Sequence, residues 1–310
     1  MTSNTAPTKT PTAQTPTAQT STARTPTAQT PNPKIANPNP NTAPDLARLL
    51  PAAVEAARAA GTQLAGHRPA EPVPATDLAS FAEAFRSYDE PAAALLHDRL
   101  GALRPQAGLL TDEFGDEVPD EGEWWLCDAT DGAVQYLQGL PYWCVSVTLL
   151  RDGAPVLTVL HAPLQGMTYT ATLGGGARLG SRPVRPSRRA LSAAVVATSH
   201  PPFADRHPEA ARWAGASLGA ALGSVLAVRN LGPTSLQVAH VASGHLDAFW
   251  SYGPDAANLL PGALIAREAG ATVTDAAGAP WTPRSAGFLA ASPTLHQEFV
   301  TSVTNSPALG

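Results

Sequence analysis

The sequence predicts a layered α/β fold, and three features of the 310-residue chain indicate it. The second half alternates apolar, strand-like runs with segments of helical apolar spacing. The first half holds two neighbouring apolar runs joined by Arg-Asp-Gly at 151–153, which is typical of a β-hairpin. The composition, with 44% hydrophobic and 15% charged residues, is that of a globular protein.

The first 43 residues differ from the rest of the chain. The sequence PTAQT occurs at 11–15, 16–20 and 26–30, and Pro and Thr dominate. Because so little apolar mass is present, we expect residues 1–43 to form a disordered tail, with a recognition or phosphorylation tail as the functional alternative. The remainder is expected to divide into an N-terminal α+β half, 44–190, and a C-terminal α/β half, 191–310.

The elements of both halves follow from apolar periodicity. In the N-terminal half we predict helices at 46–67 and 90–102, strands at 124–127, 142–150 and 155–161, and a glycine-rich turn between two short strands at 174–184. In the C-terminal half we predict strands at 195–199, 225–230, 246–250 and 271–275, and helices at 207–222, 235–244 and 258–270. Glycine ends the second and third of these last helices.

Charge and cysteine content exclude several classes of protein. The net charge is −5, and the first 43 residues carry three basic and no acidic side chains, so the remainder carries −8. This argues against a nucleic-acid partner and is compatible with a cation site. Cys127 and Cys144 lie in apolar runs, as expected for buried thiols of a reducing cytoplasm. No apolar run is long enough to cross a membrane, and the N-terminus lacks the apolar segment of a secretory signal, so no membrane partner is expected.

The stretch Asp-Ala-Thr-Asp-Gly at 128–132 is the first candidate for chemistry. It follows an apolar run at 124–127, so that Asp128 and Asp131 lie where a strand ends and can turn toward one point. Mg²⁺ prefers such oxygen ligands and keeps waters and a substrate phosphate. We expect a helix to begin at Gly132, with free N–H groups facing an anion. The alternative is a simple Asx-turn and helix cap.

Other acidic segments strengthen the prediction of a functional site at 128–132. A second acidic turn lies at 109–115, and an acidic loop enters a helix within 244–270. In this order the segments resemble the inositol monophosphatase family of Mg²⁺-dependent, often lithium-sensitive phosphatases. Residues 124–153 are similar to the family's D-P-I-D-G-T-x-N-F segment, 174–187 to its G-A-x-x-N-G-x-P-I-x-V-S turn, and 230–250 to its R-x-G-S-A-A-L helix and L-D-A-Y-W strand. The similarity spans roughly residues 45 to 300.

The resemblance implies an αβαβα sandwich of the inositol monophosphatase/fructose-1,6-bisphosphatase type, and a homodimer. It also implies that Mg²⁺ ions hold the phosphate and activate a water for in-line attack. Asp128 and Asp131 match the family's paired metal-binding aspartates, and the carbonyl of Thr130 matches a backbone ligand. Gly132 and the N–H of Ala133 match the phosphate-binding helix start. Asp89 matches an outer acid near a third metal.

The chain departs from the family pattern at several of these positions. Asp112 stands at the metal-binding glutamate of G-E-E, and its side chain is shorter by one bond, about 1.5 Å. Ala133 replaces a threonine whose hydroxyl orients the attacking water. Asn258 falls on a late metal-binding aspartate, which removes one negative charge. Asp255, three residues earlier, would compensate only through a different loop path. Ser251 falls where inositol-specific members carry a glutamate that reads substrate hydroxyls.

These residues give a first functional hypothesis and two alternatives. The first is a Mg²⁺-dependent phosphomonoesterase acting on a small phosphorylated metabolite, a sugar, cyclitol or nucleotide phosphate, with inositol 1-phosphate disfavoured by Ser251. Asp112 and Asp131 would be catalytic, with Asp128, Thr130 and Asn258 as further metal ligands and Gly132, Ala133 and Ser251 at the substrate. The second is a family member without efficient hydrolysis that binds a phosphorylated ligand or serves a specialised pathway. The third is an interaction protein whose tail is the working part.

Overall fold

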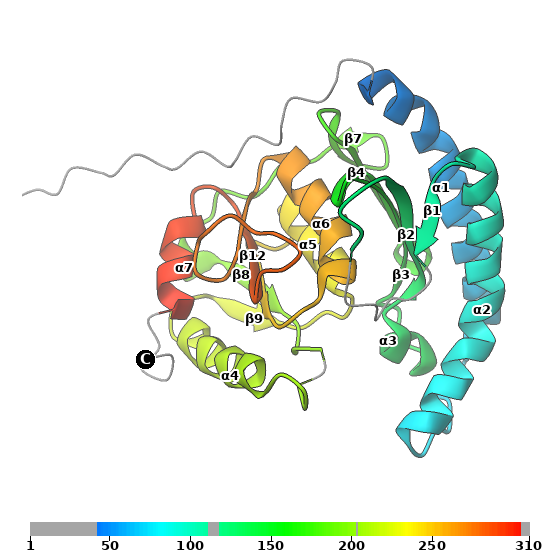
Figure 1. Cartoon of the computed structure of the whole chain (residues 1–310). Coiled ribbons are helices and arrows are strands. Elements are labelled where there is room, and N and C mark those ends of the chain that lie inside the picture. Colours follow the sequence, from blue (N-terminus) through cyan, green and yellow to red (C-terminus); the bar gives the residue numbers. More distant parts are fainter. Residues whose placement is uncertain (1–41, 111–117, 203, 305–310) are drawn as a thin grey trace, which may run out of the picture. The chain divides into compact units, whose positions relative to one another are not determined.

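Two β-sheets alternate with three helical layers in the computed structural model, which describes residues 42–110, 118–202 and 204–304 (Figure 1). Helices α1 and α2 pack on one face of the first sheet, and α5 and α6 lie between the sheets. Helices α4 and α7 cover the other face of the second sheet. The predicted layered α/β architecture is therefore confirmed. The predicted tail lies outside the described residues, except for its last two residues, which begin α1.

The first sheet has seven strands in the order β1-β2-β3-β4-β5-β6-β7, and only β1 and β2 are parallel neighbours. The strands are β1 Gly108–Leu110, β2 Glu123–Asp131, β3 Cys144–Arg151, β4 Ala154–Ala162, β5 Met167–Thr172, β6 Gly176–Leu179 and β7 Arg182–Pro183. The predicted hairpin is confirmed between β3 and β4. Its two turn residues, Asp152 and Gly153, have φ of 49° and 73°, the left-handed backbone that a tight hairpin requires.

The second sheet has five strands in the order β11-β12-β10-β8-β9. They are β8 Val195–Thr198, β9 Ala227–Arg229, β10 Ala248–Tyr252, β11 Thr272–Thr274 and β12 Gly287–Ala291. The four strands predicted in this half are confirmed, and β12 is an addition. The two sheets draw their strands from 108–183 and 195–291, on either side of the expected boundary. A division of the chain into two separate domains stays a prediction.

The helices are α1 Thr42–His67, α2 Leu78–Leu103, α3 Ala133–Leu137, α4 Pro208–Leu222, α5 Thr234–Ala242, α6 Ala256–Ala269 and α7 His296–Thr304, with short 3₁₀ turns at Pro163–Gln165 and Leu191–Ala193. The prediction that a helix starts at residue 90 was wrong, because α2 begins twelve residues earlier. A capping box starts it: Asp77 accepts a hydrogen bond from the N–H of Ser80, whose hydroxyl accepts from the N–H of Asp77. None of the described helices is both long and apolar enough to span a membrane.

Helices α5 and α6 approach each other closely at Gly262. A Cβ at this position would lie 2.6 Å from the Cβ of Val238 and 2.9 Å from the carbonyl oxygen of Ser235, so only glycine allows the contact. Helix α5 is almost entirely buried between the sheets, as is the middle of α6 at 259–266, and the N-terminal ends of both helices enter the candidate active site described below. The spacing of this helix pair therefore sets the position of site residues.

A polar cluster joins α5 to the first sheet at the opposite end of that helix. The hydroxyl of Tyr169 on β5 is hydrogen-bonded to Nδ1 of His240 at 3.0 Å and to Oγ of Ser243 at 2.9 Å. Burial lowers the pKa of His240 to about 4, and the neighbouring His245 contributes to the decrease. His240 is therefore a neutral residue that packs between α5 and the first sheet.

We predict that Gly262→Ala lowers the free energy of unfolding by about 1–3 kcal/mol, because the added methyl group must push α6 away from α5. Chemical denaturation of the purified protein measures this. Gly215→Ala is the matched control, since Gly215 lies inside α4 and a Cβ added there would meet no atom within 4 Å. That variant should be neutral or gain about 0.5–1 kcal/mol. Equal effects of the two substitutions would contradict the close helix approach.

We predict that His240 makes the fold sensitive to acid. Its folded pKa lies below its unfolded value, so between about pH 6.5 and pH 4 the unfolded chain holds a proton that the folded chain lacks. The stability that His240 contributes is lost as the pH falls through this window, up to about 3 kcal/mol. Denaturation at several pH values should show a flatter profile for His240→Gln than for the exposed control His207→Gln. Parallel profiles would refute the assignment.

Candidate active site

The end of β2 carries the Asp-Ala-Thr-Asp stretch. The prediction that the strand stops at residue 127 was wrong, because β2 continues to Asp131. The pairing with β3 is irregular here: Asp128 lies opposite Ser146 and Asp131 opposite Cys144, so one strand has an extra residue. Oδ1 of Asp128 accepts a hydrogen bond from the N–H of Thr130 at 2.8 Å. The Asx-turn is thus present, and the bulge brings both aspartates to the same end of the sheet.

Gly132 turns the chain from β2 into α3. Its φ is +103°, a conformation that favours glycine, and it precedes the five-residue helix Ala133–Leu137. A Cβ here would lie 2.9 Å from Cγ of Pro233 and 3.1 Å from Cβ of Trp143. The predicted helix start is confirmed, and it lies against the residue that precedes α5.

The carboxylate of Asp131 is buried, with a relative exposure of 5% for the residue. Its Oδ2 accepts hydrogen bonds from the hydroxyl of Ser235 on α5 and, at 3.6 Å, from the thiol of Cys144 on β3. Burial raises the pKa of Asp131 to about 6. Burial also raises the pKa of Cys144 well above its ordinary value, so the thiol keeps its proton and remains a donor. Asp131 is therefore held by two neutral donors from two different elements.

Asp255 and Asn258 lie at the start of α6. Asp255 occupies the N-cap position, yet its side chain makes no capping hydrogen bond to the helix. Instead its Oδ1 accepts a hydrogen bond from Nδ2 of Asn258 at 2.7 Å. Burial is the largest cause that raises the pKa of Asp255 to about 7, and the negative charge of Asp131 contributes to this increase. The two carboxylates are therefore electrostatic neighbours although they are far apart in sequence.

Thr130 links the same stretch to α2. Its hydroxyl donates a hydrogen bond of 2.7 Å to Oδ1 of Asp89, and burial raises the pKa of Asp89. This contact places Asp89 next to the 128–131 stretch, and its role as an outer acid near a third metal stays a prediction. Thr130 itself is almost fully buried, so its backbone position is fixed by packing as well as by the Asx-turn.

The remaining predicted residues have different surroundings. Asp112 lies outside the described residues, within 111–117. Ala133 is half-buried at the start of α3. Ser251 lies on β10 with a relative exposure of 3%, and its hydroxyl has no hydrogen-bond partner in the described part of the chain. Strand alternation places Ser251 on the same face as Phe249, which packs in the core beside α5 and α6. A substrate contact for Ser251 stays a prediction.

The donor set fits a hard divalent cation. Asp131 is buried and the neighbouring Asp255 is half-buried. Within residues 42–110, 118–202 and 204–304 no Arg or His forms an ion pair with either carboxylate. Buried charges without a counter-charge are costly, whereas Mg²⁺ is bound through one or two carboxylates together with water and phosphate. The described residues contain no group of three His, Cys, Asp or Glu that converges as a metal site. The predicted contribution of Asp112 is thus the part of this site that the described ranges leave untested.

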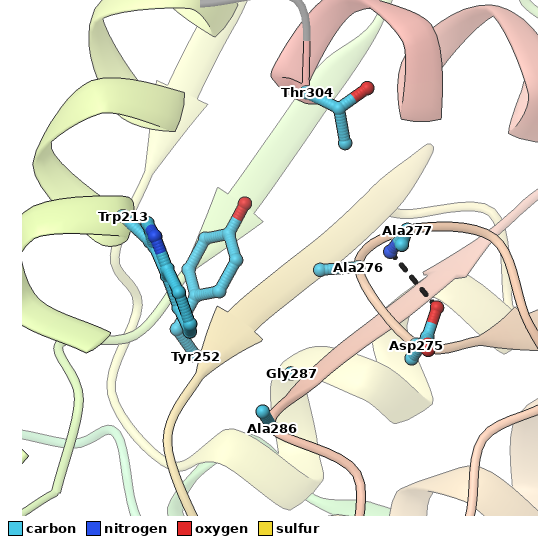
Figure 2. A pocket seen from close by; sticks show the side chains of 8 residues that line it. All are labelled: Trp213, Tyr252, Asp275, Ala276, Ala277, Ala286, Gly287 and Thr304. Atoms are coloured by element: carbon cyan, nitrogen blue, oxygen red, sulfur yellow. Dashed lines mark hydrogen bonds between the residues drawn. The ribbon is translucent and has the colours of Figure 1, made fainter. Parts of the chain in front are cut away.

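A cavity lies away from these carboxylates. Figure 2 shows a cavity of about 350 Å³ lined by Trp213 of α4, Tyr252 of β10, Asp275, Ala276, Ala277, Ala286, Gly287 and Thr304 of α7. It opens on the face of the second sheet that α4 and α7 cover. Oδ1 of Asp275 accepts hydrogen bonds from the N–H groups of Ala277 and Ala279, so it stabilises its own turn. The candidate active site is therefore the cluster at the starts of α5 and α6, not this cavity.

Sequence reasoning missed the roles of Ser235 and Cys144. Cys144 was expected to be a buried thiol, which is confirmed, and both cysteines are free. Its contact with Asp131 depends on the β2–β3 register, which local patterns do not give. Ser235 lies 104 residues from Asp131, and its only local signal is a hydroxyl in the first turn of a predicted helix.

Comparison with known proteins shows what the chain is similar to. An inositol-1-monophosphatase of Rhizobium meliloti is 36% identical over 194 residues, which cover 61% of this chain and 71% of the relative. The Nus factor SuhB of Escherichia coli is 30% identical over 233 residues, which cover 74% of this chain and 86% of the relative. One relative is named as a phosphatase and the other as a Nus factor, so the names do not agree on one function. The expectation of no nucleic-acid partner, drawn from net charge, therefore stays a prediction.

Solved structures agree with the fold. The inositol monophosphatase from Anabaena (Nostoc) superposes with a TM-score of 0.72 at 25% identity, covering 86% of this chain and 98% of the other. Mycobacterium tuberculosis SuhB superposes with a TM-score of 0.68 at 28% identity, covering 86% and 99%. Residues 45–308 match the model of the inositol monophosphatase family. The resemblance drawn from the sequence motifs is confirmed: the chain belongs to the inositol monophosphatase family.

Proposed function

We propose that this protein is a Mg²⁺-dependent phosphomonoesterase that acts on a small phosphorylated metabolite. The observation that carries the proposal is a pair of carboxylates, the buried Asp131 and the half-buried Asp255, which accept from neutral donors and lack a basic partner among the described residues. Membership of the inositol monophosphatase family and relatives named inositol-1-monophosphatase support it. We propose a sugar, cyclitol or nucleotide phosphate as substrate, in a homodimeric cytoplasmic protein.

In this proposal each residue has a defined task. Asp112, Asp128, Asp131 and the carbonyl of Thr130 would hold the cation, which when bound would supply charge neutralisation for the phosphate and activation of a water. Ser235 and Cys144 fix the orientation of the Asp131 carboxylate by occupying its Oδ2. The N–H groups of Gly132 and Ala133 lack acceptors inside the short helix α3 and would donate to phosphate oxygens.

A second candidate is a family member that binds a phosphorylated ligand without efficient hydrolysis. Ala133 favours it, because the family's threonine hydroxyl at this position helps to orient the attacking water. Loss of one positioned catalytic group commonly costs about 10²–10⁴-fold in rate. Asn258 favours it as well, since an amide replaces a carboxylate. The two candidates differ in turnover, not in fold or in ligand chemistry.

The test of the proposal is phosphate release from a panel of sugar, cyclitol and nucleotide monophosphates, with Mg²⁺ and with EDTA. We expect release from at least one compound with Mg²⁺ and none with EDTA. Asp131→Asn should lower the rate at least about 10²-fold, because it removes a ligand charge and the acceptor for two donors. Asp98→Asn on the exposed face of α2 is the control and should leave the rate unchanged. Absence of release would reject the phosphatase and favour the second candidate, whereas release that persists in EDTA would reject the Mg²⁺ dependence.

We predict that Ala133→Thr raises kcat about tenfold or more, because it returns a hydroxyl to the start of α3. Ala133→Val is the matched control, since valine has nearly the same shape and lacks the hydroxyl. The comparison uses the best substrate of the panel at saturating Mg²⁺. If both variants behave alike, position 133 acts through packing only, and water orientation in this chain depends on another group.

A further inference from the structure

The start of α6 contains an aspartate whose usual structural role is missing. Aspartate is common at N-cap positions because its carboxylate accepts hydrogen bonds from the first N–H groups of the helix. Asp255 occupies that position in α6 but makes no such bond. Its Oδ1 accepts from the side chain of Asn258 instead. The position of Asp255 is therefore not explained by helix capping.

The surroundings of Asp255 point toward the candidate active site. Thr234 and Ser235 are the first two residues of α5. The hydroxyl of Ser235 donates to Asp131, while that of Thr234 donates to Oγ of Ser199 at 3.1 Å and lies near enough to Asp255 to affect its pKa. The start of α5 thus lies beside both carboxylates. The charge of Asp131 contributes to the raised pKa of Asp255, as expected for two neighbouring acids without a cation between them.

Asn258 has the opposite arrangement. It stands where the sequence motif of the family has a metal-binding aspartate, but its amide nitrogen donates to Asp255. An amide nitrogen that faces a carboxylate cannot be a metal ligand, since cations bind the amide oxygen. Asn258 is therefore placed to orient Asp255, and the two residues lie three positions apart on one side of the first turn of α6.

We propose that Asp255 is a metal-ligating residue of this site and that Asn258 is the positioning residue that holds its carboxylate. Compared with the family motif, the negatively charged ligand stands about one helical turn earlier, at position 255 instead of position 258, at the start of the same helix. This inference rests on the proposed Mg²⁺ site and deepens it. It also replaces the sequence-based assignment of Asn258 as a ligand.

The test uses Mn²⁺, which prefers the same oxygen ligands as Mg²⁺ and can be followed by electron paramagnetic resonance of the free ion. We expect Asp255→Asn to raise the Mn²⁺ dissociation constant at least about tenfold, since even residues that only orient a ligand cost 10–100-fold when mutated. Asn258→Ala should weaken binding less than Asp255→Asn does. Asp77→Asn, at the N-cap of α2, is the matched control and should leave Mn²⁺ binding unchanged.

Thermal unfolding of the metal-free variants separates a ligand from a structural residue. If Asp255 is a ligand, Asp255→Asn should keep or raise the metal-free Tm, because it removes a half-buried charge that the charge of Asp131 repels. Mn²⁺ should then shift the Tm of this variant less than it shifts that of the parent. A lower metal-free Tm with unchanged Mn²⁺ binding would assign Asp255 a structural role and overturn the inference.

Three further outcomes are decisive. Mn²⁺ binding by Asp255→Asn within twofold of the parent overturns the role of Asp255, and the proposed function stands if the parent still releases phosphate. A greater loss for Asn258→Ala than for Asp255→Asn returns the ligand role to Asn258. A parent protein that binds no Mn²⁺ overturns both the inference and the metal-dependent function.

Discussion

The burial of the Asp131 carboxylate is the constraint on which the site depends. It joins the end of β2 to β3 through Cys144 and to α5 through Ser235. Hydrogen bonds to a charged group contribute about 1.5–3 kcal/mol each, whereas removing an unpaired charge from water costs several kcal/mol. The pKa of Asp131 stays raised despite its two donors, so they orient the carboxylate without fully offsetting its burial. The proposed cation would supply the missing counter-charge for Asp131 and for the neighbouring Asp255.

Several irregular backbone features follow from bringing these groups together. The β2–β3 register shifts so that Asp128 and Asp131 reach the same end of the sheet. Gly132 adopts a positive φ and leaves room for Pro233, which places the start of α3 against the start of α5. Gly262 lets α6 approach α5, so that the start of α5 lies beside two carboxylates from different parts of the chain. Regular geometry at any of these points would separate the groups, which is why departures from local rules gather here.

The sequence predicted the features that depend on neighbouring residues. The hairpin at Asp152 and Gly153 and the helices that end before Gly244 and Gly270 follow from local turn and cap chemistry. The start of α2 was missed because the apolar spacing was given more weight than the capping box at Asp77. The site was predicted only in its contiguous part, residues 128–133. Contacts such as Ser235 with Asp131 or Asn258 with Asp255 depend on helix placement and side-chain rotation, which periodicity does not determine.

The pattern of differences from the family motif distinguishes rearrangement from decay. If the chain had stopped binding a cation, replacing Asp131 or Asp255 by asparagine would increase stability, because the two neighbouring carboxylates, one buried and one half-buried, have no basic partner among the described residues. Both carboxylates are present, and each is held by side chains that orient it. The hydroxyl lost at Ala133 affects turnover, while the retained carboxylates affect cation binding. The chain thus retains the carboxylates of Asp131 and Asp255, which would destabilise the fold in the absence of a cation. Their retention favours a site that still binds a cation over one that has lost this function.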